Sequence, residues 1–272
     1  MTLAYSTRNV AALDPIWSRL RNEAEALARA EPVMANLAQS IVLKHHRFED
    51  ALTYRIAQKL SNSEFSALAI RDLAEEAVEA MPEIAISARA DLLAVVERDP
   101  ACHRTIEPLL FLKGFNAIQS ARVANYFWTA GRKDLASLLQ MRTSEVFGVD
   151  IHPGARLGKG LMIDHATGVV VGETAVIGDD VSMLHGVTLG GTGKDEGDRH
   201  PKVGNGVLIG ANASILGNIR IGDNSRIGAG SVVLEAVPAN CTAVGIPARV
   251  VGDAGCKQPS RSMDHWICCG ED

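Results

Sequence analysis

The chain divides into two halves that differ in the spacing of their apolar residues. Up to about residue 143, apolar side chains recur every three or four positions, as in Ile16, Leu20, Ala24 and Leu27. That spacing gathers apolar side chains on one face of an α-helix. We therefore predict a helical N-terminal half, with helices in the segments DPIWSRLRNEAEALARA, EPVMANLAQSIVLKHH, FEDALTYRIAQKLS and IRDLAEEAVEAMPEIAISARADLLAVVERDP.

Local signals set the expected ends of these helices. Asp14 and Ser63 carry side-chain oxygens that accept hydrogen bonds from the free N–H groups of a first helical turn, so we predict them as N-caps. The residue before a proline disfavours the helical conformation, so Asp99 before Pro100 should close a helix. Asp99 is then either a helix terminator alone or a functional carboxylate held at a helix end.

A period of six residues replaces the helical spacing from residue 149 onward. An aliphatic residue opens each step of six, and glycine follows many of these residues. Such hexads are typical of a parallel β-helix, in which each hexad forms a short strand and a corner, and the aliphatic side chain points to the axis. The pattern includes Ile151, Leu157, Ile163, Val171, Ile177, Met183, Leu189, Val203, Ile209, Ile215, Ile221, Ile227 and Val233.

The repeat is interrupted twice. The step from Ile163 to Val171 is eight residues, and the step from Leu189 to Val203 is fourteen. A solenoid core cannot absorb the extra residues, so they should leave the prism as loops, where repeat proteins place binding groups. The first interruption holds His165, and the second holds the segment GGTGKDEGDRHPK.

Four motifs resemble those of the bacterial serine O-acetyltransferases, a family of hexapeptide-repeat acyltransferases. They are RDPA near residue 99, IDHATG around residue 165, GDRHPK around residue 199 and VGIPARVVG near the end of the repeat. The resemblance covers roughly residues 13 to 253 and implies an α+β multidomain fold. We expect a helical N-terminal domain at 1–143, a left-handed parallel β-helix at 144–252 with an excursion loop at 190–202, and a C-terminal tail at 253–272.

The resemblance also implies an activity and an assembly. The family transfers the acetyl group of acetyl-CoA to the hydroxyl of L-serine, giving O-acetyl-L-serine and CoA for cysteine biosynthesis. Acetyl-CoA would be a cosubstrate, with no permanently bound cofactor and no metal. L-cysteine would inhibit by feedback, and the chain would form homotrimers that pair as dimers of trimers.

The family's coils contain three hexads, so Ile163 and Met183 should be neighbours on adjacent coils. His165 and His185 follow these two residues by two positions each, so they should lie near one edge of the prism. We expect Asp150 at the same edge. A carboxylate that orients an imidazole makes a general base. The resemblance gives His165 that role in direct transfer, with Asp150 orienting it. Each residue also has another interpretation. His165 could be a solvated corner residue, Asp150 could form a turn, and His185 could fill space or contact the substrate.

The remaining site residues follow from matched motifs. The resemblance implies that Asp99 and Asp164 bind the amino acid, with Arg199 and His200 as a further substrate-binding pair, Arg199 suited to a carboxylate by its two-pronged guanidinium. Arg199 and His200 are alternatively loop side chains in water. Contacts with acetyl-CoA are implied for residues whose small side chains let a pantetheine arm approach the backbone, namely Gly191, Thr192, Ala211 and Ala229.

Three other functions are compatible with a hexapeptide β-helix. One is an acyltransferase that uses a sugar or an amine as acceptor, distinguished by acceptor choice. Another is a zinc lyase like the γ-class carbonic anhydrases, in which three histidines, here His165, His185 and His200, hold a metal. The third is a non-enzymatic scaffold whose loops bind partners, which would not need His165.

Charge and composition exclude several partners and suggest a compartment. With 27 Lys and Arg against 32 Asp and Glu, the net charge is −5, which offers no basic excess for nucleic acid or an anionic membrane. No run approaches the roughly 20 apolar residues that span a bilayer, and no secretory signal is apparent, so we expect the cytoplasm. Five scattered cysteines fit reduced thiols, although Cys268 and Cys269 could bind metal.

The C-terminus departs from the family pattern. Many members end in isoleucine, which inserts into the active site of O-acetylserine sulfhydrylase, whereas this sequence ends in CCGED. Two acidic residues in place of an apolar one argue against that complex.

Overall fold

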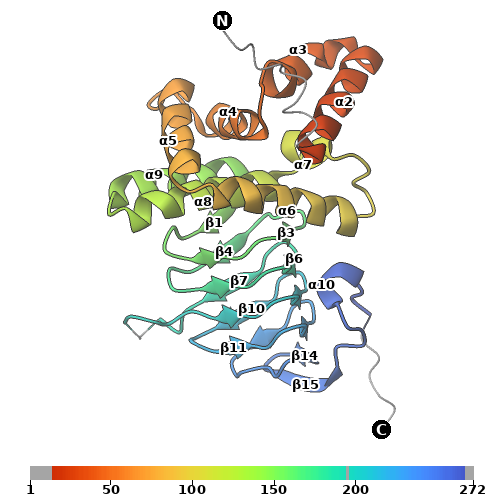
Figure 1. Ribbon diagram of the computed structural model, residues 1–272. Helices are drawn as coiled ribbons and strands as arrows, with labels where there is room; N and C mark the ends of the chain where they lie inside the picture. Colours follow the sequence, from red (N-terminus) through yellow and green to blue (C-terminus); the bar gives the residue numbers. More distant parts are fainter. Residues whose placement is uncertain (1–13, 194–195, 267–272) are drawn as a thin grey trace, which may run out of the picture.

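The computed structural model describes residues 14–193 and 196–266, and it places a block of helices on top of a three-sided β-helix (Figure 1). Every helix among the described residues is too short or too polar to span a lipid bilayer. The helical block consists of α2 (Pro15–Ala30), η1 (Pro32–Met34), α3 (Ala35–Ala38), the π-helical η2 (Gln39–Leu43), α4 (Phe48–Leu60), α5 (Ala67–Ala80), α6 (Glu83–Arg98), α7 (Ile106–Leu110), α8 (Lys113–Thr129) and α9 (Lys133–Phe147).

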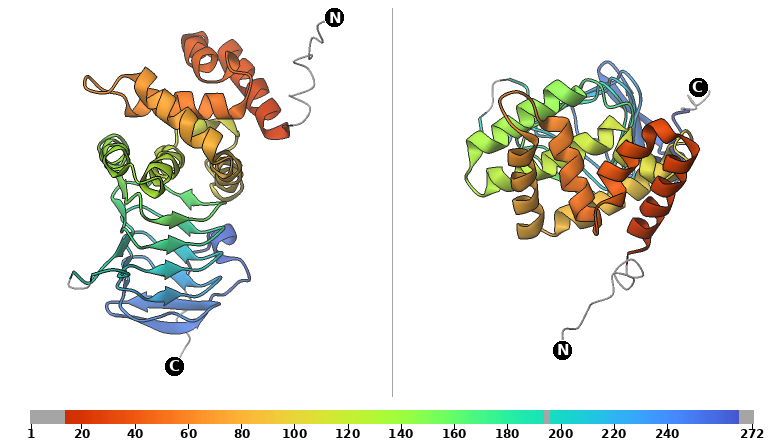
Figure 2. Two further views of the ribbon diagram at one scale, coloured as in Figure 1. Left: turned by 60° about the vertical axis from the view of Figure 1, so that its left-hand side comes forward. Right: turned by 90° about the horizontal axis from the view of Figure 1, so that it is seen from above.

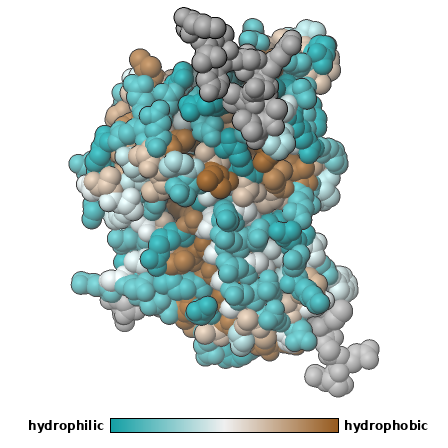
Figure 3. All heavy atoms as spheres, viewed as in Figure 1, coloured by the Kyte–Doolittle hydropathy of each residue, from teal (hydrophilic) through white to brown (hydrophobic). Residues whose placement is uncertain are grey.

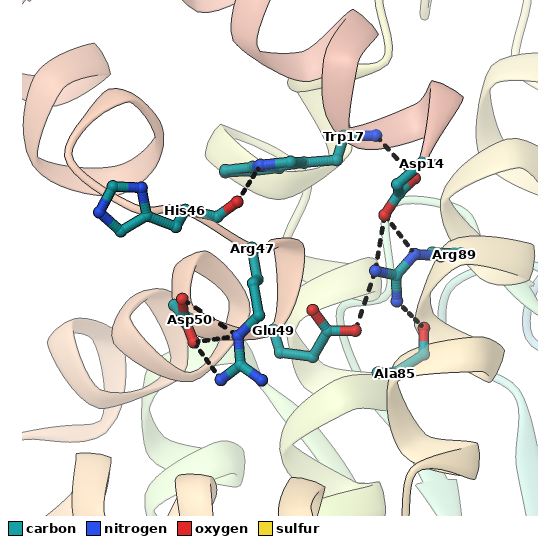
Figure 4. Close-up of polar contacts among 8 residues, drawn as sticks. All are labelled: Asp14, Trp17, His46, Arg47, Glu49, Asp50, Ala85 and Arg89. Carbon is teal, nitrogen blue, oxygen red and sulfur yellow. Dashed lines mark hydrogen bonds and ion pairs between the residues drawn. The ribbon is translucent and has the colours of Figure 1, made fainter. Parts of the chain in front are cut away.

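A polar cluster joins the outer helices α2 and α4 to α6, which lies next to the β-helix (Figure 4). Asp14 caps α2 as predicted, because its Oδ1 accepts a hydrogen bond from the backbone N–H of Trp17 at 3.0 Å. Its other oxygen accepts from Arg89 of α6 at 2.7 Å, and the same guanidinium lies 2.9 Å from Glu49 of α4. The indole N–H of Trp17 donates to the carbonyl of His46 at 2.8 Å. These contacts hold α2, α4 and α6 together.

Two predicted helix ends had different outcomes. The cap predicted at Ser63 is wrong, because the side chain of Asn62 accepts from the backbone of Glu64 and Phe65 and keeps this segment in a turn. The cap is Ser66, whose hydroxyl accepts from the N–H of Ala69 at 3.2 Å. The end predicted at Asp99 is confirmed, since α6 stops at Arg98 with Asp99 as its C-cap.

The transition to the β-helix comes at Gly148, which ends α9 in the left-handed conformation with a φ of 65°. The solenoid strands are short and begin directly after it. They are β1 (Val149–Ile151), β2 (Arg156–Leu157), β3 (Met162–Ile163), β4 (Val169–Val171), β5 (Val176–Ile177), β6 (Ser182–Met183), β7 (Thr188–Gly190), β8 (Lys202–Val203), β9 (Leu208–Ile209), β10 (Ser214–Leu216), β11 (Arg220–Ile221), β12 (Arg226–Ile227) and β13 (Val232–Val233).

The strands form three sheets, which are the sides of a prism. The last two strands are β14 (Cys241–Gly245) and β15 (Ala248–Asp253), and the sheet orders are β1-β4-β7-β10-β13, β11-β8-β5-β2 and β15-β14-β12-β9-β6-β3. All pairs are parallel except the closing hairpin of β14 and β15, after which α10 (Pro259–Ser262) packs against the side of the prism. Of the predicted hexad aliphatics, all except the half-buried Leu157 are buried, which confirms the hexapeptide β-helix.

The two predicted interruptions lie at different edges of the prism. The first edge joins the β3-containing sheet to the β1-containing sheet and carries the residues after β3, β6, β9 and β12; we call it the His165 edge. The second joins the β1-containing sheet to the β2-containing sheet and carries the residues after β1, β4 and β7, including the excursion loop; we call it the His200 edge.

Helices α6, α8 and α9 lie across the top of the first coil, and Figure 2 (left) shows them nearly end-on. Asp91 of α6, fully buried, fixes this contact. Its Oδ2 accepts from Gln119 at 2.9 Å and from Arg122 at 2.8 Å, both on α8, while its Oδ1 accepts from the backbone of Leu161 at 2.8 Å. Arg122 also donates to the carbonyl of Gly158 at 2.6 Å. A buried network therefore sets the position of the helices over the coils.

Candidate active site

His165 and His185 lie together at the His165 edge, as the hexad count predicted. Ile163 and Met183 are paired neighbours in adjacent strands, and the two imidazole centroids are 5.9 Å apart. The two-residue insertion after β3 places His165 and Ala166 in the left-handed region, with φ values of 55° and 60°. Non-glycine residues rarely adopt this conformation, and it is enriched at functional sites. It leaves the His165 side chain 74% exposed, open to a substrate.

A pocket of about 610 Å³ opens beside His165, between the helical block and β3. Three predicted site residues line it: Asp99 at the end of α6, and Asp164 and His165 after β3. Asp99 accepts from the N–H of Ala101 at 2.8 Å, and Asp164 Oδ2 lies 3.7 Å from His165 Nε2. The structure therefore brings together carboxylates and an imidazole from the two halves of the sequence.

Gly114 of α8 determines how closely the helices approach this pocket. A Cβ at this position would lie 2.1 Å from the carbonyl oxygen of Ile163, so only glycine lets the helix backbone rest against β3. Sequence reasoning did not single out Gly114, because a lone glycine in a helical pattern gives no indication of what it contacts.

Asp150 does not join this cluster within one chain. It is the middle residue of β1, half-buried on the sheet between the two edges, and its Oδ1 accepts from Gln140 of α9 at 2.7 Å. Among the described residues, no hydrogen bond or ion pair links Asp150 to His165. The expected dyad of Asp150 and His165 is therefore not formed by contacts within a single copy.

Arg199 and His200 lie at the His200 edge. The Thr174 hydroxyl accepts from the backbone N–H groups of both residues, at 3.0 and 3.1 Å. Arg199 pairs with Glu173 at 2.7 Å, and this hydrogen bond lowers the pKa of Glu173. His200 is buried, and a Cβ on Gly172 would lie 2.0 Å from its ring, so the glycine makes room for the imidazole. The pair is thus held in place rather than loose in water.

Sequence reasoning missed Glu173 and Thr174. Both lie in an ordinary hexad, GETAVIG, where polar residues normally occupy a solvated corner. They matter because the excursion loop folds back onto that corner, where Arg199 and His200 contact Thr174, which lies 25 and 26 residues earlier in the sequence. The hexad pattern carries no signal that this corner meets the excursion loop.

Acidification should destabilise the protein through His200. Burial, followed by the positive charge of Arg199, lowers the pKa of His200, so its ring binds a proton less readily in the folded chain than in the unfolded chain. The unfolded chain binds a proton near the ordinary pKa of about 6.5, so stability falls as pH drops below that value. We expect urea unfolding at about pH 7.5 and about pH 5.5 to show a smaller loss of stability in His200→Gln than in the native chain. An equal loss in both would contradict this assignment.

The residues expected to contact CoA divide between the two edges. Ala211 and Ala229 lie on the His165 edge, below His185, because the N–H of Asn212 donates to the His185 carbonyl and the N–H of Gly230 to the Ala211 carbonyl. Gly191 and Thr192 follow β7 and lie on the His200 edge; a Cβ on Gly191 would lie 3.6 Å from His200 Nε2.

The three histidines of the zinc hypothesis do not converge in one copy. His165 and His185 share one edge, whereas His200 contacts Thr174 on the other, through its Nδ1 at 2.9 Å. Over residues 14–193 and 196–266, no group of three or more His, Cys, Asp or Glu side chains could hold a metal ion. Cys268 and Cys269 lie outside the described residues.

A left-handed β-helix of hexapeptide repeats, with an exposed histidine beside a pocket at one edge, is typical of the hexapeptide-repeat transferases. The family model "Bacterial transferase hexapeptide (six repeats)" matches residues 200–235, and "Serine acetyltransferase, N-terminal" matches residues 16–120. The serine acetyltransferase of Salmonella typhimurium is 53% identical over 252 residues, which are 93% of this chain and 92% of the relative. The chain belongs to the serine acetyltransferase family.

Solved structures agree with this assignment. Serine acetyltransferase from Vibrio cholerae has a TM-score of 0.92 at 49% identity, covering 94% of this chain and 99% of the relative. The enzyme from Brucella abortus in complex with coenzyme A has a TM-score of 0.88 at 53% identity, covering 90% and 98%. Relatives have also been solved in complex with cysteine, at 50% identity, and, from Neisseria gonorrhoeae, with serine, at 52% identity.

Proposed function

We propose that this chain transfers acetyl from acetyl-CoA to the hydroxyl of L-serine, with His165 as the general base. The observation that carries the proposal is the pocket beside His165, where Asp99 and Asp164 line the same space as an exposed imidazole. Paired carboxylates suit a substrate ammonium group, and a neutral imidazole suits removal of a hydroxyl proton. The complexes of relatives with serine and with CoA support this pair of substrates.

The transfer is direct. His165 takes the proton of the serine Oγ as that oxygen attacks the thioester carbonyl carbon of acetyl-CoA. The tetrahedral intermediate collapses, the carbon–sulfur bond breaks, and the imidazolium returns its proton to the CoA thiolate. The products are O-acetyl-L-serine and CoA. General-base assistance of this kind contributes typically about 10²–10⁴-fold, and holding both substrates in line supplies much of the rest.

The separation of the two edges supports a site that is built from two copies of the chain. Asp99, Asp164 and His165 lie at one edge, whereas Arg199 and His200 lie at the other, with a sheet between them. We propose a homotrimer in which the His165 edge of one copy faces the His200 edge of the next, so that Arg199 receives the serine carboxylate. Asp150, on the sheet between the edges, would then orient His165 of the neighbouring copy.

The intervening sheet has a surface that suits such packing. Val170, in the centre of β4, faces outward and is 41% exposed between the buried Val169 and Val171. On the side seen in Figure 3, exposed apolar atoms form a band from the helices down over the coils, where Figure 1 labels β4 and β7. We also propose that the chain has two domains, at residues 1–143 and 144–252. Two trimers would then pair through their helical domains. Light scattering should give a mass that is a multiple of three chains.

Acetyl-CoA would lie between the facing edges. Ala211 and Ala229 continue the His165 edge downward from His185, while Gly191 and Thr192 lie beside His200 on the opposing edge. Small side chains on both edges allow the pantetheine arm to approach the backbone and bring the thioester toward His165. L-cysteine resembles serine closely enough to occupy the amino-acid pocket, so we propose that it inhibits competitively, as a relative's complex with cysteine suggests.

Release of CoA from acetyl-CoA, followed with a thiol reagent, tests the proposed reaction. L-serine should drive release, and L-cysteine should suppress it in competition with L-serine, measured by loss of acetyl-CoA because cysteine itself reacts with the reagent. Galactosides, nucleotide sugars and simple amines serve as the matched acceptors. Release driven by one of these but not by L-serine would contradict the proposal and favour the other acyltransferase function.

A further inference from the structure

Arg98, the last residue of α6, is buried at the junction between the helices and the coils. Its side chain is only 1% exposed, and its guanidinium reaches three groups of the β-helix. Nη1 donates to the carbonyl of Gly160 at 3.0 Å and to the hydroxyl of Ser182 at 3.1 Å, while Nη2 donates to Asp180 Oδ1 at 2.8 Å. The end of α6 is thereby tied to two successive coils.

The next residue is Asp99, which faces the pocket. As the C-cap of α6, Asp99 donates its N–H to the carbonyl of Val95 at 2.9 Å and receives the N–H of Ala101 at its side chain. Its backbone therefore follows the position of the helix end. Anything that lets the end of α6 shift would move the Asp99 carboxylate relative to Asp164 and His165, which lie on the coils.

Asp180 is shaped for this contact. It adopts a left-handed conformation with a φ of 56°, and a Cβ on Gly160 would lie 2.5 Å from its Oδ1. Glycine at 160 therefore leaves room for the carboxylate to reach Arg98. The C-terminal helix α10 also contacts Asp180 and Ser182. The Ser182 hydroxyl donates to the carbonyl of Ser260 at 2.8 Å, and Arg261 lies 3.7 Å from Asp180.

We propose that Arg98, held by Asp180, is a positioning residue for the amino-acid site, setting the distance between Asp99 and the His165 edge. The inference rests on the proposed role of Asp99 in binding the serine ammonium group. Arg98 touches neither substrate nor His165 in this account and acts through Asp99 alone. Its loss should weaken serine binding and spare both the chemical step and acetyl-CoA.

Steady-state kinetics of Asp180→Asn and Arg98→Lys test this role. Asp180→Asn keeps the side-chain volume at a partly exposed position and removes the charge that faces Arg98. We expect the KM for L-serine to rise about tenfold, because small misplacements of binding groups have large effects, with kcat and the KM for acetyl-CoA nearly unchanged. Arg226→Lys is the control: it perturbs another buried arginine, on β12, whose hydrogen bonds go to Thr242, Asp264 and Trp266 and not to α6, so it should lower stability without changing the KM for L-serine.

A double-mutant cycle separates positioning from general damage. In an Asp99→Asn background, Asp180→Asn should cause no further rise in the KM for L-serine. If Asp180→Asn raised the KM for L-serine equally in both backgrounds, the inference would be overturned and the proposed function would stand. The same conclusion would follow if Asp99→Asn raised this KM and Asp180→Asn left it unchanged in the native background. An unchanged KM in Asp99→Asn itself would instead show that the proposed serine site is wrong, and the inference would fall with it.

Discussion

Replacing His165 by Ala should lower kcat for acetylation of L-serine by about 10²–10⁴-fold, the usual contribution of a general base. The imidazole is 74% exposed, so its removal leaves no buried cavity and should change the thermal midpoint little. The KM values for both substrates should remain close to those of the native chain, because the pocket keeps Asp99 and Asp164. CoA release at saturating substrates measures the effect.

His185→Asn is the matched control for His165→Ala. His185 lies on the adjacent coil of the same edge, with ring centroids 5.9 Å apart, but it does not line the pocket that holds His165. We expect a far smaller loss of kcat in this variant. Full serine-dependent turnover in His165→Ala, or equal losses in the two variants, would exclude His165 as the base and would reopen the scaffold interpretation or point to another base.

Asp91→Ala should destabilise the protein by about 3–5 kcal/mol, the cost of leaving a buried charge without its partner. Asp91 is fully buried and is the only carboxylate paired with Arg122 among the described residues. Its removal also orphans the backbone N–H of Leu161 and the side chain of Gln119, which donate to it. Urea unfolding should show a lower midpoint.

Two further variants check the cause of the Asp91→Ala effect. Glu25→Ala removes one partner of an exposed pair, in which Arg29 and Glu25 are 73% and 49% exposed and 3.7 Å apart, and it should cost less than about 1 kcal/mol. Adding Arg122→Met to Asp91→Ala should recover part of the lost stability, because the unpaired buried charge is gone. No recovery would show that the carboxylate acts through its other hydrogen bonds instead.

The β-helix and the position of His165 could be predicted because the information is local and periodic. Each hexad puts one aliphatic residue on the axis, so counting hexads fixes which residues stack, as the pairing of Ile163 with Met183 confirms. The same count showed where residues must leave the prism, and both excursions occur there. Capping and proline signals correctly predicted the helix ends at Asp14 and Asp99. The cap predicted at Ser63 was wrong because Asn62 holds that segment in a turn.

The contacts between the two halves could not be predicted from spacing. Neither Asp91 nor Arg98 differs in pattern from other charged helix residues, and only the packed structure shows that both reach the coils. Asp150 shows a related limit of sequence-based prediction. Its position next to Ile151 fixes the coil on which it lies, but it does not fix which side chain its carboxylate contacts. The division of the site between two edges likewise depends on where the excursion loop folds back.

In the proposed mechanism an alcohol loses its proton to His165 at a site completed by a second copy of the chain. A structure of the protein with L-serine bound is the decisive measurement for this mechanism. We expect the serine Oγ within about 2.6–3.2 Å of a ring nitrogen of His165, the ammonium group at Asp99 and Asp164, and the carboxylate at Arg199 of a neighbouring copy. Serine bound away from His165, with its Oγ next to a different base, would contradict this mechanism.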